Sequence, residues 1–211
     1  MKIMAINGSP KTEGSVSQMI IDQLAKLSDN KIPTFPAKSF LNDVNSEDKV
    51  NTLLKQDVLL VVFPLYVDSL PAPLIDVLLK IQANITNTKE LPLVYAVCNC
   101  GLYESQHNSL ALNMIEHFCE ESGLSWGGGL GIGHGGMLES MGQNWSKGPA
   151  AAVYKALTVF AEAISKKTAF ANYYASASFP RFLYIISANL GWHYLAFKNK
   201  VHGKIKAKPY T

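Results

Sequence analysis

The segment from Gly8 to Ser17, GSPKTEGSVS, contains the residues that point most directly to a chemical role. It follows a short apolar run at 2–7 and precedes apolar residues at helical spacing, so it would join a buried strand to a helix with Ser15 as N-cap. Its glycines allow close backbone approach, and the hydroxyl of Ser9, like those of the later serines, can donate to phosphate oxygens. With the N–H groups of a helix N-terminus, the segment predicts a phosphate-binding loop.

This loop differs from the two commoner phosphate motifs. The stretch from Gly8 to Gly14 is one residue too long for G-x-x-x-x-G-K-[ST], Ser15 stands where the lysine would be, and G-x-G-x-x-G is not matched either. The missing lysine argues against nucleotide hydrolysis. An ordinary strand-to-helix turn capped by serine is the alternative for this loop taken alone.

Two further strand ends favour a planar ligand. The run at 57–64, DVLLVVFP, is typical of a strand buried on both faces, and Leu65 and Tyr66 after it offer a flat apolar surface. A second buried strand at 91–99 leads into NCGLYESQ, with a glycine and an aromatic residue. Ligands of open α/β sheets bind at the carboxyl ends of strands, so three such ends predict a site for a planar heterocycle joined to a phosphate.

The alternation of strands and helices predicts an α/β fold of the flavodoxin-like type, a three-layer sandwich around a five-stranded parallel sheet of order 2-1-3-4-5. Pro33 and Pro36 place the second strand at a sheet edge, as that order requires. We expect a first domain at 1–170 and a C-terminal helical extension with a basic tail at 171–211. The expected strands are 2–7, 32–40, 57–64, 91–99 and 125–133, the last central or at an edge, and the expected helices are 15–27, 46–56, 71–84, 105–122 and 151–167.

Composition bounds the function. The 211 residues are 48% hydrophobic, enough for a sizeable core, and a net charge of +3 without a dense basic stripe argues against a nucleic-acid partner. Cys98, Cys100 and Cys119 fit neither a zinc site nor a disulfide framework nor a redox pair, so we expect free thiols, no metal site and a cytoplasmic protein. No signal peptide is expected at the N-terminus.

The C-terminal stretch is rich in aromatic residues. Its uncharged run from Phe182 to Phe197 is shorter than the ~20 residues that cross a bilayer. It predicts a helix packed on its own domain or on a partner subunit, giving a homodimer or homotetramer, and we expect no membrane association. An interfacial membrane helix is the alternative. The basic stretch after it, KNKVHGKIKAK, is interpreted as a solvated tail.

Two motifs together, INGSPKTEGSVSQMI and FPLYVDSLPAPLIDVLL, resemble the flavodoxin-like NAD(P)H-dependent FMN reductases and quinone reductases. The stretch from Cys98 to Gly136 is similar to the later part of that family, and the resemblance covers roughly 1–165. It implies bound FMN. The residues that it places around the phosphate are Ser9, Lys11, Ser15, Val16 and Ser17; along the ring, Pro64, Leu65, Tyr66 and Val67; and at the other flank of the ring, Asn99, Cys100, Gly101, Leu102 and Tyr103.

The resemblance also implies an activity. Hydride would pass from NAD(P)H through FMN to a quinone, a flavin or another small electron acceptor, by ping-pong kinetics and without a catalytic side chain, because the flavin carries the chemistry. The compact cysteine cluster of the related iron–sulfur flavoproteins is absent from the sequence. A non-enzymatic flavodoxin-type electron carrier is the alternative, although such carriers dock through acidic surfaces and this chain is slightly basic. A module that kept the fold and lost the cofactor is the third interpretation.

Several other residues have two interpretations. The glycine-rich loop at 133–148 is predicted to close over the flavin. His134 within it is expected to be a plain loop residue, with a substrate role as the alternative, and Glu104 would either reach the flavin edge or cap a helix. Trp126 and Trp145 are expected to pack in the core or its rim, the alternative being a roof over a partner's flavin.

Overall fold

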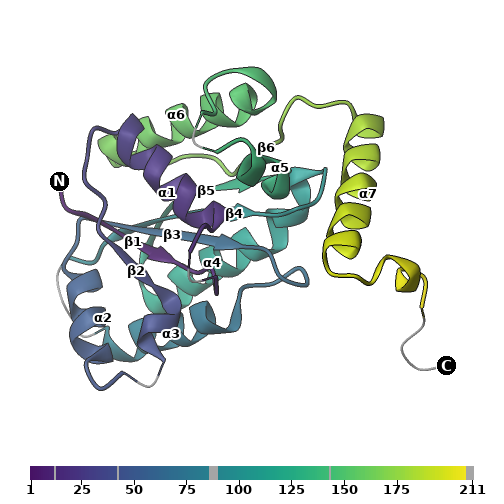
Figure 1. Cartoon of the computed structure of the whole chain (residues 1–211). Helices are drawn as coiled ribbons and strands as arrows, with labels where there is room; N and C mark the ends of the chain where they lie inside the picture. The colour runs from purple at the N-terminus through teal and green to yellow at the C-terminus, as the bar shows by residue number, and fades with distance from the viewer. Residues whose placement is uncertain (12, 42, 86–89, 143, 208–211) are drawn as a thin grey trace. The chain divides into compact units, whose positions relative to one another are not determined.

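The structure is a computed structural model that describes residues 1–11, 13–41, 43–85, 90–142 and 144–207. The chain forms two compact units, Met1–Ala177 and Ser178–Thr211, which are described separately. The first unit is built on a six-stranded parallel sheet (Figure 1). Its strands, in the spatial order β2-β1-β3-β4-β5-β6, are β1 Ile3–Asn7, β2 Thr34–Pro36, β3 Val58–Pro64, β4 Leu93–Asn99, β5 Ser125–Ile132 and β6 Tyr173–Ala175.

The predicted order 2-1-3-4-5 is confirmed, and the proline-bearing β2 is a three-residue edge strand. The prediction of five strands is wrong by one, since β6 adds to the outer side of β5, pairing Gly131 with Tyr174 and Ile132 with Ala175. Because β6 belongs to this sheet, the first unit extends past the expected boundary at residue 170.

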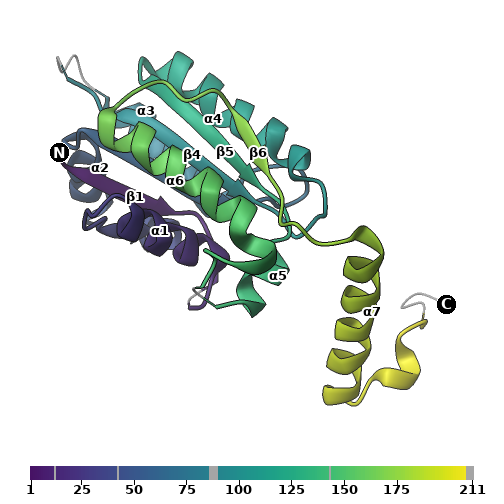
Figure 2. The ribbon, with the colours of Figure 1, turned by 90° about the horizontal axis from the view of Figure 1, so that it is seen from above.

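Helices cover both faces of the sheet (Figure 2). One face carries α1 Val16–Leu27, α5 Gly135–Ser140 and α6 Ala151–Lys166; the other carries α2 Ser46–Leu54, α3 Ala72–Asn84 and α4 Ser109–Ser122. Each face has its own apolar core, one including Leu24, Val62 and Trp145 and the other Phe63 and Leu74. Short 3-10 segments lie at η1 Ala37–Phe40, η2 Ser105–Asn108 and η3 Gly148–Ala150.

The glycines of β5 make room for large rings. A Cβ at Gly127 would lie 2.7 Å from the ring of Tyr95, and one at Gly131 would lie 2.6 Å from the ring of Tyr174. Both rings therefore occupy space that a side chain on β5 would otherwise fill. This explains how a glycine-rich strand lies inside the sheet, between β4 and β6.

The second unit contains α7 Arg181–Lys198 and the 3-10 segment η4 His202–Lys204. The chain turns back after α7, so that His193 Nδ1 and His202 Nε2 are 3.2 Å apart. No described side chain of α7 is buried. Across the described ranges, none of the helices has both the length and the apolar character needed to cross a membrane.

Candidate cofactor site

The carboxyl ends of β1, β3 and β4 meet at a crevice of about 170 Å³. The backbone brings them together because these strands are neighbours in a parallel sheet, with Asn99 opposite Pro64 in the β3–β4 pairing. Ten of the residues predicted one by one line this crevice, together with Gly135 and Gly136 from the loop that was predicted to close over the flavin. The ten are Ser9, Lys11, Ser15, Val16, Ser17, Pro64, Leu65, Tyr66, Asn99 and Gly101.

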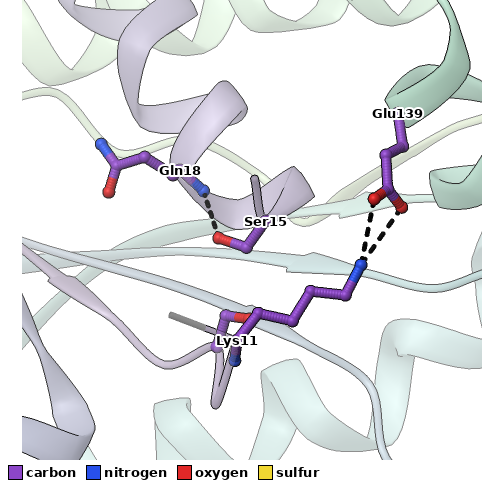
Figure 3. A network of polar contacts seen from close by, with 5 residues as sticks. Lys11, Ser15, Gln18 and Glu139 are labelled. Atoms are coloured by element: carbon purple, nitrogen blue, oxygen red, sulfur yellow. Dashed lines mark hydrogen bonds and ion pairs between the residues drawn. The ribbon is translucent and has the colours of Figure 1, made fainter. Parts of the chain in front are cut away.

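The N-terminus of α1 forms one wall of the crevice. Ser15 is its N-cap, as predicted, and the Ser15 Oγ accepts a hydrogen bond from the backbone N–H of Gln18 at 3.1 Å (Figure 3). The first turn of a helix has N–H groups without intrahelical partners, and it carries partial positive charge. This wall therefore suits an anion.

Two buried asparagines hold the serines of this wall in place. Asn99 Nδ2 donates to Ser17 Oγ at 3.1 Å and to the carbonyl oxygen of Phe63 at 2.9 Å. Asn7 Oδ1 accepts from the backbone N–H of Ser9 at 3.0 Å. The oxygen of Ser17 thus accepts from Asn99, which leaves the serine's own proton to donate to a ligand.

The two loop glycines have different physical roles. A Cβ at Gly8 would lie 2.7 Å from Phe63 Cβ and 3.1 Å from Leu74 Cδ2, so packing of the loop on β3 and α3 requires a glycine there. Gly14 has φ of +62°, a left-handed conformation that glycine adopts without strain. The close approach of Gly8 is therefore to the protein's own core.

Lys11 extends from this loop to α5, where its Nζ lies 3.1 and 3.3 Å from the two carboxylate oxygens of Glu139 (Figure 3). Both side chains are about half exposed. Among the described residues that line the crevice, Lys11 is the one with a charged side chain. An anion in the crevice would compete with Glu139 for this ammonium group.

A tight turn follows the β3 end of the crevice. Tyr66 and Ser69 exchange backbone hydrogen bonds of 3.1 and 3.0 Å, and the two residues between them, Val67 and Asp68, have φ of 50° and 56°. Positive φ is unusual for a β-branched residue such as Val67, so the turn is strained. Val67 itself is 99% exposed and does not line the crevice, whereas the neighbouring Tyr66 does.

Three other predicted residues also lie outside the crevice lining. Cys100 is buried, its Sγ is 3.5 Å from Asn108 Nδ2, and burial raises the pKa of its thiol. The carbonyl oxygen of Leu102 accepts from the backbone N–H of His134 at 2.8 Å, and the Tyr103 ring stands edge-on to the His134 ring with centroids 4.5 Å apart. These residues join the loop after β4 to the segment that begins α5.

His134 is buried and precedes α5 with φ of 61°. Burial lowers the pKa of its imidazole, and the charge of Glu104 opposes that shift. The loop predicted at 133–148 thus contains a buried histidine and two helical segments, α5 and η3. Glu104 does not line the crevice and lies 3.9 Å from His107 Nε2.

The remaining residues with two interpretations pack in the protein. Trp145 is fully buried in the core under α1 and α6, and Trp126 packs against the core on the other face. Both therefore fill the interior, as expected. Cys98, Cys100 and Cys119 are buried free thiols, also as expected, and burial raises the pKa of Cys119 to about 12.

Comparison with known proteins gives structural neighbours only. No protein-family model matches the sequence, and no curated protein matches it significantly. Among solved structures, an NADH:FMN oxidoreductase in its apo form is similar, with 15% identity, a TM-score of 0.58, and coverage of 79% of this chain and 89% of that one. A flavodoxin of Streptococcus pneumoniae is similar at 14% identity and a TM-score of 0.52, covering 79% of this chain and 99% of that one.

General stress protein 14 of Treponema denticola, solved in complex with FMN, is also similar, at 15% identity and a TM-score of 0.53, with coverage of 76% of this chain and 99% of that one. At identities this low, the structural similarity establishes a shared fold and nothing beyond it. The chain therefore has the flavodoxin-like fold, as its resemblance to that superfamily implied.

Proposed function

We propose that the protein is an FMN-dependent oxidoreductase that takes hydride from NADH or NADPH and passes electrons to a quinone, a flavin or a similar small acceptor. The observation that carries this proposal is the crevice itself. It combines serine hydroxyls and helix N–H groups at one end with Leu65 and Tyr66 at the other. Structural neighbours named as FMN oxidoreductases or solved with FMN support the choice of cofactor.

The phosphate of FMN would be held at the α1 end. The hydroxyls of Ser9, Ser15 and Ser17 line that end, and each oxygen already accepts a hydrogen bond from the protein, at 3.3, 3.1 and 3.1 Å respectively. Each serine can therefore direct its proton at a phosphate oxygen. Lys11 would add a positive charge from the side.

The ring of FMN would lie along the β3 end. The crevice volume of about 170 Å³ is below the ~300–1,000 Å³ of sites that enclose a drug-sized ligand, so a ligand the size of FMN would extend over Leu65 and Tyr66. Tyr66 is 45% exposed, which leaves its surface available for a planar ring. A ring placed this way would keep one side open to a second planar molecule.

The bound flavin would supply the capacity to accept and release hydride. The role of the protein is then to bind the flavin, to orient it and to leave one face of its ring accessible. The described lining offers Lys11 and Tyr66 as its ionisable side chains. Lys11 is paired with Glu139 in an ion pair whose two side chains are about half exposed. This composition supports positioning as the main contribution of the protein.

The test is an anaerobic absorbance measurement on protein loaded with FMN. We expect NADPH or NADH to bleach the flavin band directly, and turnover with a quinone to show ping-pong kinetics, because both substrates would use the same open face. A protein that fails to take up FMN would overturn the proposal at the level of the cofactor. Stable FMN binding without bleaching by either nucleotide would overturn the reductase activity alone.

An electron carrier of the flavodoxin type is the second candidate, and the charge distribution favours it more than the total charge does. All 16 acidic residues precede Ser178, together with 13 of the 19 basic ones, so residues 1–177 have a formal charge of −3. The surface that surrounds the crevice therefore belongs to a slightly acidic unit. Bleaching only in the presence of a separate reductase would identify a carrier.

A further inference from the structure

The segment from Ser178 to Thr211 has an unusual composition. It contains six of the 19 basic residues of the chain and none of the 16 acidic ones, a formal charge of +6 against −3 for the rest. Five of the six are lysines that follow the apolar part of α7: Lys198, Lys200, Lys204, Lys206 and Lys208. The weak basicity of the whole protein thus comes entirely from this segment.

The same segment exposes a large apolar surface. Among the described residues, half of the large hydrophobic side chains that are exposed lie here, although the segment is a small part of the chain. On α7 they include Phe182, Leu190, Trp192, Tyr194 and Phe197, all between 64% and 74% exposed. An exposed apolar surface of this kind marks an interaction site.

The distribution of apolar residues around α7 narrows the choice of partner. Between Arg181 and Lys198 the polar side chains other than tyrosine are Ser187, Asn189 and His193, so large apolar groups emerge on nearly every side of the helix. A helix that is apolar all round belongs inside a protein core or in lipid.

The lysines narrow the choice of partner further. Protein–protein interfaces are depleted in lysine, whereas lysine clusters beside an apolar helix are typical of segments that bind anionic lipid. The return of the chain after α7 brings His202 within 3.2 Å of His193, which keeps the start of the basic stretch beside the helix. The apolar side chains of α7 and the positive charges that follow it can therefore contact the same lipid surface.

We propose that residues 178–211 bind the protein to the interface of an anionic lipid bilayer. Trp, Tyr and Phe side chains of α7 enter the boundary between headgroups and acyl chains, and the lysines that follow pair with lipid phosphates and carboxylates. The helix lies in the interface, since its apolar run is shorter than a bilayer requires. This inference departs from the expectation of no membrane association, and it does not depend on the proposed function.

The experiment is vesicle binding by the full-length protein. Vesicles of phosphatidylcholine, with and without phosphatidylserine, are sedimented with the protein while tryptophan emission is recorded. We expect binding to the anionic vesicles, weakened by added salt because screening acts on the lysines. Binding should shift the emission to the blue, since Trp192 is 71% exposed while Trp145 is buried and Trp126 partly so. Trp192→Phe should bind yet lose that shift.

Charge reversal supplies the matched pair of variants. Changing Lys198, Lys200, Lys204 and Lys206 to Glu should weaken binding to anionic vesicles at least ~100-fold, because each basic residue near such a surface contributes about 1 kcal/mol. Changing four exposed lysines of the first unit gives the same net charge and should leave binding nearly unchanged. These control positions are Lys2, Lys31, Lys55 and Lys155.

Three outcomes would overturn the inference. One is the absence of binding to anionic vesicles. Another is equal loss in both charge-reversed variants, which would make binding a matter of total charge. The third is a stable dimer in solution in which Trp192 is already shielded and vesicles cause no shift, since α7 would then be covered by a second copy. Circular dichroism on each variant checks that the fold is intact.

Discussion

Ser17 connects the interior of the protein to the candidate site through a single hydroxyl group. Its oxygen accepts from the buried Asn99 amide, and its proton remains for a ligand. We predict that Ser17→Ala weakens FMN binding about 10-fold or more, because a hydrogen bond to a charged group contributes about 1.5–3 kcal/mol. Ser165→Ala, which removes a helix serine bonded to Ala161, is the matched control. Fluorescence titration of FMN measures both, and equal affinities would contradict the role given to Ser17.

Glu139 competes with any anion for Lys11. We predict that Glu139→Gln strengthens FMN binding, by no more than about fivefold, because half-exposed ion pairs are worth ~0–1 kcal/mol. Glu162→Gln provides the control, since it releases Lys166 from a similar exposed pair on α6. The gain should shrink as salt is added. A weaker affinity in Glu139→Gln would show that the ion pair holds the loop in its binding conformation.

His134 makes stability depend on pH. Burial lowers the pKa of its imidazole below the ordinary value, so the unfolded chain takes up the proton first as pH falls through about 6.5. Stability is therefore kept above that pH and lost below it. We predict that His134→Asn, which tolerates the left-handed φ of 61°, loses less stability between about pH 7 and about pH 5 than the unchanged protein.

Urea unfolding at both pH values measures the effect of His134→Asn. The exposed His117 on α4 supplies the comparison, because its replacement by Asn should leave the pH dependence as it was. Equal pH dependence in all three proteins would mean that other groups dominate the acid loss of stability.

At the scale of elements, the turn between β3 and α3 carries strain beside the candidate site. Val67 has φ of 50° and is almost fully exposed, so no packing energy offsets its conformation. We predict that Val67→Asn stabilises the fold by about 1 kcal/mol, because Asn accepts left-handed φ at little cost. Val44→Asn, at a position 95% exposed and outside the residues of positive φ, should change stability little. Equal urea midpoints for Val67→Asn and the parent would show that the turn is relaxed.

Elements with long patterns could be predicted, and short ones could not. Several residues in a row signal β3 and β4, which are continuous apolar runs, and the start of α1, which has a serine cap. The loops next to these elements were therefore predicted at the correct positions. β6 has three residues and α5 has six, too few for a period of two or 3.6 to emerge. Gly135 and Gly136 were therefore expected in a loop over the flavin and not at the start of a helix.

The side chains that were assigned to the site and lie elsewhere share one cause. Val67, Cys100, Leu102 and Tyr103 follow strand ends that do reach the crevice, but a sequence does not tell which way a loop side chain points. Cys100 turns inward to Asn108, and Val67 stands at the tip of a tight turn. The contact between Tyr103 and His134 depends on α5, which the sequence did not indicate.

At the scale of the whole molecule, the candidate site and the proposed lipid-binding surface belong to different units. Both apolar cores and every crevice residue belong to Met1–Ala177, while the exposed aromatic helix and the net positive charge belong to Ser178–Thr211. We predict that a chain ending at Ala177 folds, binds FMN with unchanged affinity and no longer binds anionic vesicles. FMN titration, thermal unfolding and vesicle sedimentation on the shortened and full-length proteins measure this.

The shortened chain also separates the two proposals from each other. Its formal charge changes from +3 to −3, so the control is the full-length protein with Lys2, Lys31, Lys55 and Lys155 reversed, which becomes acidic while keeping α7. If membrane binding needs the segment and not the total charge, this control binds vesicles and the shortened chain does not. Loss of FMN binding on shortening would instead mean that the C-terminal unit, of the same or of a second copy, completes the cofactor site.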